Sequence, residues 1–311
     1  MTIVQLKYAL SVEKYRNFRL AAEHLSISQP ALSLQIRKLE ETIGLVLFDR
    51  SVSPVETTPD GILFLSKAEE IVNHAENLLN FTSVLGENFN GKLKLGVIPT
   101  LAPYLIPLFA YELQKDHPLF TLEIHEMITN DIIHALRTGE LDAGLISTPI
   151  NIQGIKSIPL FYELFYFYTS EELTVGGELH LEDIDYSKLW LLNEGNCIRD
   201  QINNFCDISR VDDKKTFYYN SNSIESLIRI VDSRGGFTIL PELTTLSLDE
   251  HQIQQTLPIY PKAREIGIVY SKSSFKERFV LKMMEYIKNN IPKKMLSSEG
   301  LEVMDPEIEI G

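Results

Sequence analysis

Alternating strand and helix signals constrain the fold of this 311-residue chain more than any other feature. Short apolar runs predict strands at residues 92–98, 121–125 and 142–146, and helical patterns follow the first two at residues 104–113 and 132–138. This order predicts an α/β fold on a mainly parallel sheet with helices on both faces. A second α/β unit begins near residue 160 and returns to the first near residue 264, which predicts two lobes that exchange strands.

The only two cysteines of the chain, Cys197 and Cys206, lie in one short segment. Residues 189–192 before it predict a strand and Asn196 a helix N-cap, so Cys197 is expected in the first turn of a helix. There the helix dipole and the nearby Arg199 would stabilise a thiolate, which is the reactive form. In one continuous helix the two residues would stand roughly 13 Å apart along the axis. A disulfide needs Cα atoms within about 7 Å, so the segment forms either a regular helix or a disulfide. The alternative is that both cysteines are buried packing residues.

Residues 1–58 predict three helices and a short ribbon. The second and third helices are joined by a tight turn, where Ser28 can cap the third helix with Pro30 in its first turn. A helix, a turn and a second helix with a polar outer face is the form that enters a major groove of DNA. The net charge of −14 does not exclude this, because residues 1–60 carry seven Lys/Arg and seven Asp/Glu.

Residues 59–88 predict one long helix whose apolar residues recur at coiled-coil spacing. The seam consists of Ile62, Leu65, Ala68, Ile71, Ala75, Leu78 and Leu85. An exposed helix of this kind needs a partner, so we expect a dimerisation helix, with an intrachain core helix as the alternative. Residues 296–311 are acidic and are expected to be a disordered tail.

The chain shows no basic segment that leads into an apolar stretch and no run of about 18 apolar residues. We therefore expect a cytoplasmic protein without membrane contact, in which two cysteines indicate free or switching thiols. Metal clusters, phosphate-binding glycine loops and Ser-His-Asp patterns are not found, so neither a cofactor nor a metal nor enzymatic catalysis is expected.

The residues of the predicted helix-turn-helix resemble the winged helix-turn-helix of the LysR-type transcriptional regulators. The match comprises residues 21–23, 28–33, 35–40 and 44–50. The resemblance implies that the residues facing bases and phosphates are Gln29, Pro30, Ala31, Ser33, Gln35 and Arg37, with Arg50 at the start of the wing. Leu34 stands where the family often has Arg, and the wing lacks its usual basic residues. Fewer phosphate contacts and a shallower salt dependence are expected.

The family resemblance also implies a periplasmic-binding-protein-like effector domain over residues 91–295. Lobe I would comprise about 91–160 and 267–295, and lobe II about 161–266. Within the family, the Cys197–Gln201 run, Phe205-Cys206, Pro99-Thr100 and the region of Thr129 resemble the members that sense hydrogen peroxide. Asn196 and Tyr218 stand where those sensors often have histidine.

This second resemblance implies that Cys197 is the thiolate that reacts with peroxide and that Cys206 resolves it into a disulfide. Thr100 and Thr129 would hold the peroxide, and Arg264 would stabilise the thiolate. The implied function is a peroxide-sensing regulator, mostly an activator, that forms homodimers and then a homotetramer. Its partners would be double-stranded promoter DNA, RNA polymerase and a thiol reductant such as glutaredoxin or thioredoxin.

Two other functions remain open at this point. A LysR-type regulator that answers a small anionic metabolite would have structural cysteines, and Cys197→Ser would leave its regulation intact. A thiol peroxidase would consume many peroxide molecules per chain when a reductant is present, whereas a sensor needs only one.

Overall fold

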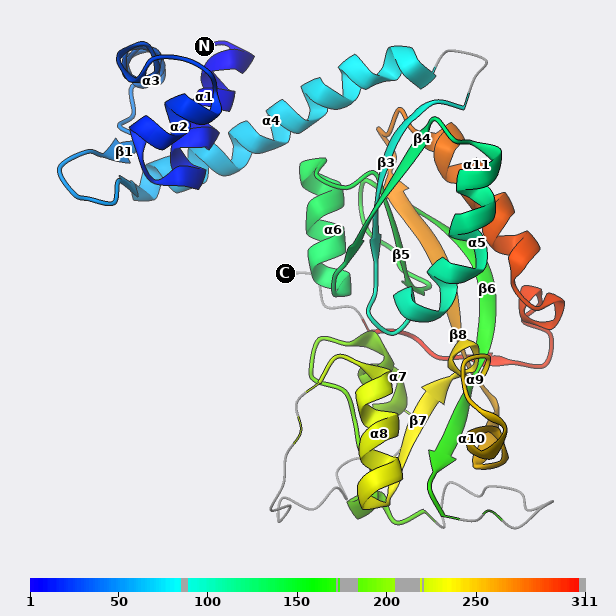
Figure 1. The fold of residues 1–311 in the computed structure, drawn as a ribbon. Coiled ribbons are helices and arrows are strands. Elements are labelled where there is room, and N and C mark those ends of the chain that lie inside the picture. The colour runs from blue at the N-terminus through cyan, green and yellow to red at the C-terminus, as the bar shows by residue number, and fades with distance from the viewer. Residues whose placement is uncertain (85–88, 172, 174–183, 205–218, 220, 308–311) are drawn as a thin grey trace. The chain divides into compact units, whose positions relative to one another are not determined.

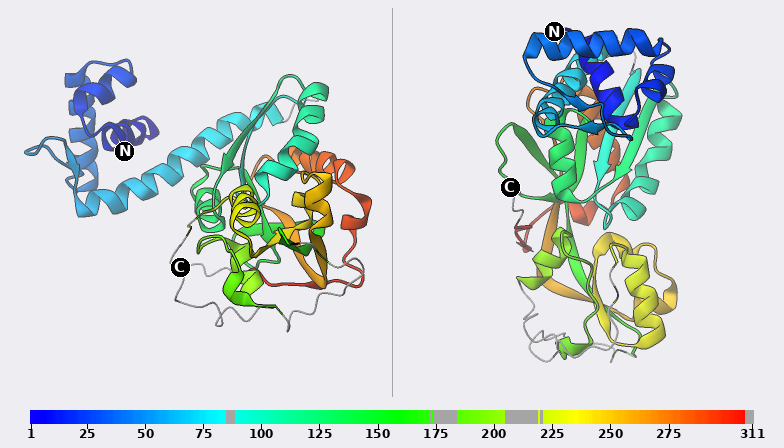
Figure 2. Two further views of the ribbon diagram at one scale, coloured as in Figure 1. Left: turned by 60° about the horizontal axis from the view of Figure 1, so that its bottom comes forward. Right: turned by 90° about the vertical axis from the view of Figure 1, so that its left-hand side faces the viewer.

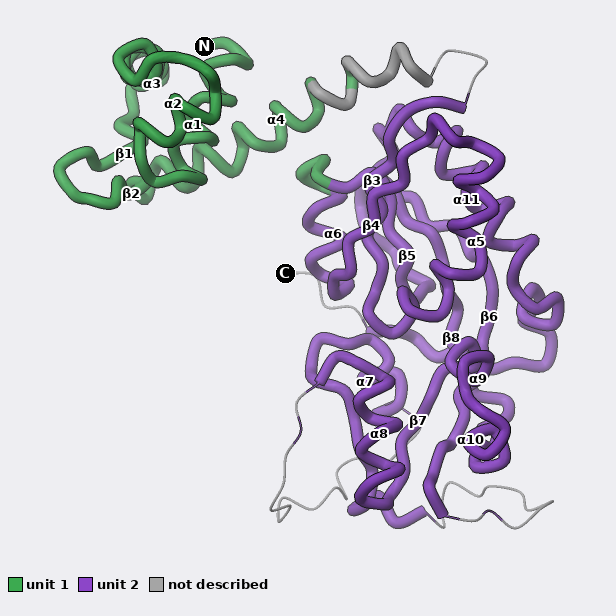
Figure 3. The backbone as a smooth tube through the Cα atoms, viewed as in Figure 1, with its two compact units in different colours: residues 1–85, 137–140 green, residues 86–136, 141–311 purple. Residues whose placement is uncertain are grey.

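The computed structural model describes the chain except residues 85–88, 172, 174–183, 205–218, 220 and 308–311. Two compact units are present (Figure 3), one of residues 1–85 with 137–140 and one of residues 86–136 with 141–311. Within the described ranges, no helix combines the length and the apolar character that a membrane crossing requires.

The first unit is the expected winged helix-turn-helix. Its elements are α1 (Ile3–Tyr15), α2 (Phe18–His24), α3 (Gln29–Ile43), the antiparallel ribbon of β1 (Phe48–Asp49) with β2 (Glu56–Thr57), and α4 (Pro59–Val84). The Ser28 hydroxyl accepts a hydrogen bond from the Ala31 amide, and Pro30 lies in the first turn of α3 as predicted. Leu32, Ile36 and Leu39 are fully buried, which leaves the opposite face of α3 to solvent.

Helix α4 begins as expected after Thr58, whose hydroxyl accepts a hydrogen bond from the Gly61 amide at 2.9 Å. The predicted apolar seam divides into two rows. Leu65 and Ala68 are buried in the core of the first unit, whereas Ile62, Ile71 and Leu78 are 56, 46 and 56% exposed. The alternative of an intrachain core helix therefore holds for the row of Leu65 and Ala68. The row of Ile62, Ile71 and Leu78 is not covered by other described residues of the first unit. Leu85 lies outside the described residues.

The second unit is a two-lobed α/β domain on a single curled sheet (Figures 1 and 2). The strands follow the order β4-β3-β5-β8-β6-β7, with β9 beside β8. Their bounds are β3 Gly91–Val97, β4 Phe120–Glu126, β5 Ala143–Thr148, β6 Ile155–Thr169, β7 Phe237–Pro241, β8 Thr256–Ser271 and β9 Glu302–Val303. The helices are α5 Ala102–Asp116, α6 Thr129–Thr138, α7 Cys197–Asn203, α8 Ile224–Arg234, α9 Glu242–Thr245, α10 Glu250–Gln254 and α11 Glu277–Asn290, with 3-10 turns at Tyr186–Lys188 and Lys293–Leu296.

The prediction of a mainly parallel sheet was wrong for the centre of this domain. Strands β4, β3 and β5 are parallel, but β5 with β8, β8 with β6 and β6 with β7 are antiparallel. The reason is that the long strands β6 and β8 run side by side in opposite directions, and together they carry the chain from one lobe to the other and back (Figure 1).

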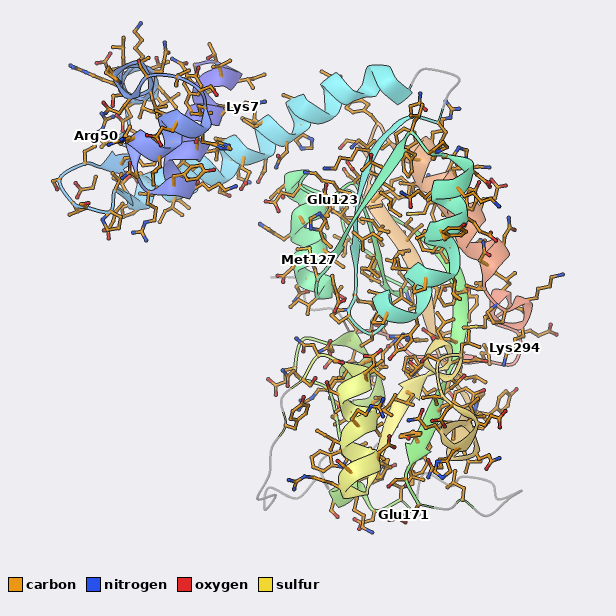
Figure 4. All side chains as sticks on the ribbon, viewed as in Figure 1. Lys7, Arg50, Glu123, Met127, Glu171 and Lys294 are labelled. Atoms are coloured by element: carbon orange, nitrogen blue, oxygen red, sulfur yellow. The ribbon has the colours of Figure 1, made fainter. Side chains whose placement is uncertain are left out.

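The sheet of lobe I accepts helix α6 closely because of a glycine. A Cβ at Gly96 on β3 would stand 2.9 Å from Ile132 of α6, closer than packed side chains allow. Met127, labelled in Figure 4, lies in the short turn between β4 and α6. This close packing places Thr129, the first residue of α6, at the end of the sheet where the two lobes meet.

Two local predictions differ from the structure. Residues 189–192 do not form a strand; only Leu189 makes an isolated bridge, to Phe237. The acidic tail is not disordered over residues 296–307, because β9 pairs with β8 and the Met304 amide donates to the Ala263 carbonyl at 2.8 Å. Backbone pairing of this kind is invisible in an acidic composition.

Candidate DNA-binding surface and thiol pocket

The residues that the sequence assigns to DNA contact belong to α3 and the adjoining ribbon. Gln29, Pro30, Ala31 and Arg37 are exposed, and Ser33 is half-buried, so this face of the helix is available. Leu34 lies on the same helix and is 52% exposed. The structure therefore places an apolar side chain on a surface where a phosphate contact would need a positive charge.

Five of these residues make side-chain contacts within the first unit. Within α3, the Gln29 side chain donates to the Ser33 hydroxyl at 3.0 Å, and Arg37 pairs with Glu41 at 3.0 Å.

The other two, Gln35 and Arg50, contact other elements. The Gln35 side-chain oxygen accepts a hydrogen bond from the buried Gln5 amide group at 3.3 Å, which ties α3 to α1. Arg50, labelled in Figure 4, pairs with Glu40 at 2.9 Å and lies over the ring of Phe18 at 4.8 Å. These contacts orient both side chains before any DNA is present.

Cys197 is the first residue of α7, as the sequence predicts, and only 8% of it is exposed. Its Sγ lies 3.0 Å from the hydroxyl oxygen of Thr129, a residue 68 positions earlier in the chain. Asn196 occupies the N-cap position, but its side chain makes no capping bond. It donates instead to the Asn193 carbonyl and to the Asn222 side chain.

Arg264 lies in the middle of β8 and is fully buried. It faces Glu163 directly in the register of β8 with β6, and its Nε donates to that carboxylate at 2.8 Å. The guanidinium also donates to the hydroxyl of Thr100 at 3.0 Å and to the Thr100 carbonyl at 3.3 Å. Glu163 in turn accepts from the Leu243 amide at 2.9 Å. A buried positive charge is thereby paired and held against the loop that follows β3.

Burial raises the pKa of the Cys197 thiol above its ordinary value, and the Asp200 carboxylate adds to this effect. The hydrogen bond with Thr129 and the positive charge of Arg264 oppose it. The structure thus brings Cys197, Thr129, Thr100 and Arg264 into one electrostatically connected group. In this conformation the protonated thiol is favoured, contrary to the thiolate that the helix position alone suggests.

Arg199 does not belong to this group. Its guanidinium donates to the Leu192 carbonyl at 3.0 Å and lies 3.7 Å from the Glu194 carboxylate. Arg199 therefore binds the loop that precedes α7. Cys206 and Tyr218 lie outside the described residues. Helix α7 itself ends at Asn203.

A pocket of about 710 Å³ opens beside the thiol. It is lined by Thr129, Asn130, Gly195, Cys197, Asp200, Asp305, Pro306 and Glu307. Both lobes and the C-terminal segment therefore contribute to its wall. None of these lining residues is basic.

Sequence reasoning missed two parts of this site. Glu163, the counterion of Arg264, stands 101 positions from it, and only the pairing of β6 with β8 brings them together. The C-terminal lining residues belong to the segment for which the acidic composition predicts a disordered tail. Asp200, in contrast, could have been predicted to lie near the thiol, since it stands three positions after Cys197 in a predicted helix.

Comparison with known proteins agrees with this architecture. The model of a bacterial regulatory helix-turn-helix protein of the lysR family matches residues 3–62, and the model of the LysR substrate binding domain matches residues 86–292. The chain therefore belongs to the LysR family of bacterial regulators.

Two individual relatives are similar to this chain over most of its length. The chain is 32% identical to the DNA-binding transcriptional dual regulator OxyR of Escherichia coli over 88% of its own length and 90% of that protein's. It is 30% identical to the hydrogen peroxide-inducible genes activator of Haemophilus influenzae, over 88% and 92% of the two chains.

Among solved structures, a full-length OxyR variant from Pseudomonas aeruginosa aligns with a TM-score of 0.71 at 28% identity, over 94% of this chain and 99% of the other. A Corynebacterium glutamicum OxyR mutant with hydrogen peroxide bound aligns with a TM-score of 0.58 at 26% identity, over 99% and 98% of the chains.

Proposed function

We propose that this LysR-family protein senses hydrogen peroxide through Cys197 and regulates transcription, mostly as an activator. The observation that carries the proposal is the position of the Cys197 sulfur, 3.0 Å from the Thr129 hydroxyl and within the field of the buried Arg264. The relatives named for hydrogen peroxide support it.

The chemistry begins with the thiol of Cys197 and one molecule of peroxide. The sulfur attacks one peroxide oxygen and the O–O bond breaks, which gives a sulfenic acid on Cys197 and one water. The Thr129 hydroxyl would hold the peroxide by a hydrogen bond, and Thr100, which is bonded to Arg264, is its proposed second contact. The positive charge of Arg264 favours the thiolate during attack.

Resolution is assigned to Cys206, whose thiol would displace the sulfenic oxygen as a second water and leave a Cys197–Cys206 disulfide. A thiol reductant such as glutaredoxin or thioredoxin would reset it. Cys197 is the first residue of a regular helix that runs to Asn203, so we propose that forming the disulfide refolds this segment.

For DNA recognition, we propose that α3 enters the major groove. Gln29, Ser33 and the neighbouring exposed residues would face bases, with Arg37 and Arg50 on phosphates. The uncovered row of α4 would bind the same helix of a second copy, and dimers would assemble into a tetramer that contacts promoter DNA and RNA polymerase.

The metabolite alternative is disfavoured by the charge of the pocket. An anionic ligand would meet Asp200, Asp305 and Glu307 on its wall, and the nearby Arg264 is buried and already paired with Glu163. A site for a small anion would need unpaired positive groups there.

The test is thiol counting by mass spectrometry before and after one equivalent of peroxide. The wild-type chain is expected to lose both thiols, and Cys206→Ser to gain a single oxygen on Cys197. Cys197→Ser, the matched control, should keep its remaining thiol and lose peroxide-dependent transcription. Two unreacted wild-type thiols would refute the proposal, and many peroxide molecules consumed per chain with a reductant would indicate an enzyme.

A further inference from the structure

The C-terminal segment is attached both to strand β8 and to helix α7, which carries the thiol. Strand β9 pairs with β8, where the Met304 amide donates to the Ala263 carbonyl at 2.8 Å. The Met304 carbonyl accepts a hydrogen bond at 2.9 Å from the side chain of Gln201, a fully buried residue of α7. The segment is therefore an integral part of the fold at this position.

Beyond Met304 the chain forms the outer wall of the thiol pocket. Pro306 is buried, whereas the side chains of Asp305 and Glu307 are exposed on the same turn. The turn is closed by the Glu307 amide, which donates to the Asp305 carboxylate at 2.8 Å. Asp200 lines the same pocket, so three carboxylates line the space beside Cys197.

We propose that Asp305 and Glu307 are specificity-determining residues that form a charge filter at the thiol pocket. Uncharged oxidants reach Cys197 without electrostatic cost, and anionic reagents are slowed by repulsion. The buried Arg264 does not reverse this, since Glu163 pairs with it at 2.7 Å. The inference rests on the proposed function only in naming hydrogen peroxide as the oxidant that is admitted.

The filter can be measured without peroxide by using methanethiosulfonate reagents of opposite charge. The Cys197 thiolate attacks the reagent's sulfenyl sulfur and expels methanesulfinate, which leaves a mixed disulfide on Cys197. The full-length Cys206→Ser protein has one reactive thiol, and mass spectrometry gives the rate for a trimethylammonium, a sulfonate and a neutral methyl reagent. The ratio of cation to anion rates does not depend on the thiolate fraction, so a change in the Cys197 pKa cancels.

In this background, Asp305→Asn with Glu307→Gln is expected to lower the cation-to-anion ratio by about three- to tenfold. The neutral reagent should react within about twofold of its original rate, because the wall keeps its shape. Asparagine retains the oxygen that accepts from the Glu307 amide. The control is Glu285→Gln with Glu299→Gln, which removes two exposed carboxylates that do not line the pocket.

An unchanged ratio in the pocket variant, or an equal fall in the control variant, would overturn the filter. A fall in the ratio confined to the pocket variant supports it. If Cys197 then proves inert to peroxide in the thiol-counting experiment, the proposed sensing function fails while the charge filter stands. The two results are therefore distinguishable.

Discussion

Replacing Glu163 by glutamine removes the counterion of a guanidinium that water does not reach. Glu163 and Arg264 are both completely buried, 2.7 Å apart. Glutamine keeps the size of the side chain and one acceptor oxygen, so the main change is the loss of the negative charge. Breaking a buried pair in this way costs about 3–5 kcal/mol, because the remaining charge is left uncompensated.

For a domain of this size, each kcal/mol corresponds to about 2–4 °C in Tm, so Glu163→Gln should lower the Tm of the second unit by roughly 6–20 °C. Trp190, the only tryptophan of the chain, reports on this unit, and its indole donates to the Gly235 carbonyl at 3.0 Å. Its fluorescence during heating or urea titration follows the unfolding of the second unit alone.

Two variants isolate the buried charge as the cause. Glu285→Gln breaks an exposed pair with Lys282 and should change stability by less than about 0.5 kcal/mol. Replacing both Glu163 and Arg264 by methionine removes both charges and should recover most of the loss. A Glu163→Gln protein with the same Tm as the wild type would refute the reasoning. It would mean that the carboxyl is already protonated, since burial raises the pKa of Glu163 against the opposing charge of Arg264.

Three further predictions concern the thiol and DNA. Thr129→Val should slow the oxidation of Cys197 by about 10- to 100-fold, because it removes a hydrogen bond to a charged group. Thr129→Ser keeps the hydroxyl and should oxidise at the wild-type rate. Equal oxidation rates for the valine and serine variants in stopped-flow assays would contradict this. Since burial raises the pKa of Cys197, the thiolate fraction and the oxidation rate should keep rising with pH through the range in which an ordinary cysteine titrates, about 8.5, and a plateau below pH 8 would disprove it. Arg37→Ala should reduce the slope of log K against log salt concentration for DNA binding by about 0.9. The control is Arg19→Ala on α2, which should leave this slope unchanged.

The parts of the molecule that the sequence predicts correctly are governed by local interactions. Ser28 caps α3 and Pro30 lies in its first turn, because capping and proline preferences act within one helical turn. Cys197 begins α7 as predicted, although the Asn196 side chain makes no capping bond. The site itself depends on distant pairings. Glu163 meets Arg264 only because β6 and β8 pair in a given register, and nothing adjacent to either residue in the chain indicates that register.

The order of the C-terminal segment also could not be predicted from the sequence. Its acidic composition is typical of disorder, yet residues 302–304 are held by backbone bonds to β8 and by the side chain of Gln201. Backbone amides pair irrespective of side-chain charge, so composition carries no signal for an added edge strand. The same segment supplies two of the three carboxylates around the pocket, which explains why sequence reasoning missed the pocket's charge.

Helix α7 has to satisfy two opposing demands if Cys197 is a switching thiol. It must hold the sulfur beside Thr129, which it does by burying Ile198 and Ile202 to 2% exposure and by the bond from Gln201 to Met304. It must also release these contacts if the disulfide refolds it. Two buried isoleucines and one hydrogen bond contribute about 4–7 kcal/mol. At about 1.4 kcal/mol per 30 mV, this raises the potential of the disulfide by roughly 90–150 mV over that of an unopposed one. If the Cys197–Cys206 disulfide forms as proposed, the packing of α7 would thus favour its reduction by thiol reductants, and the stability of the reduced form would make the switch reversible.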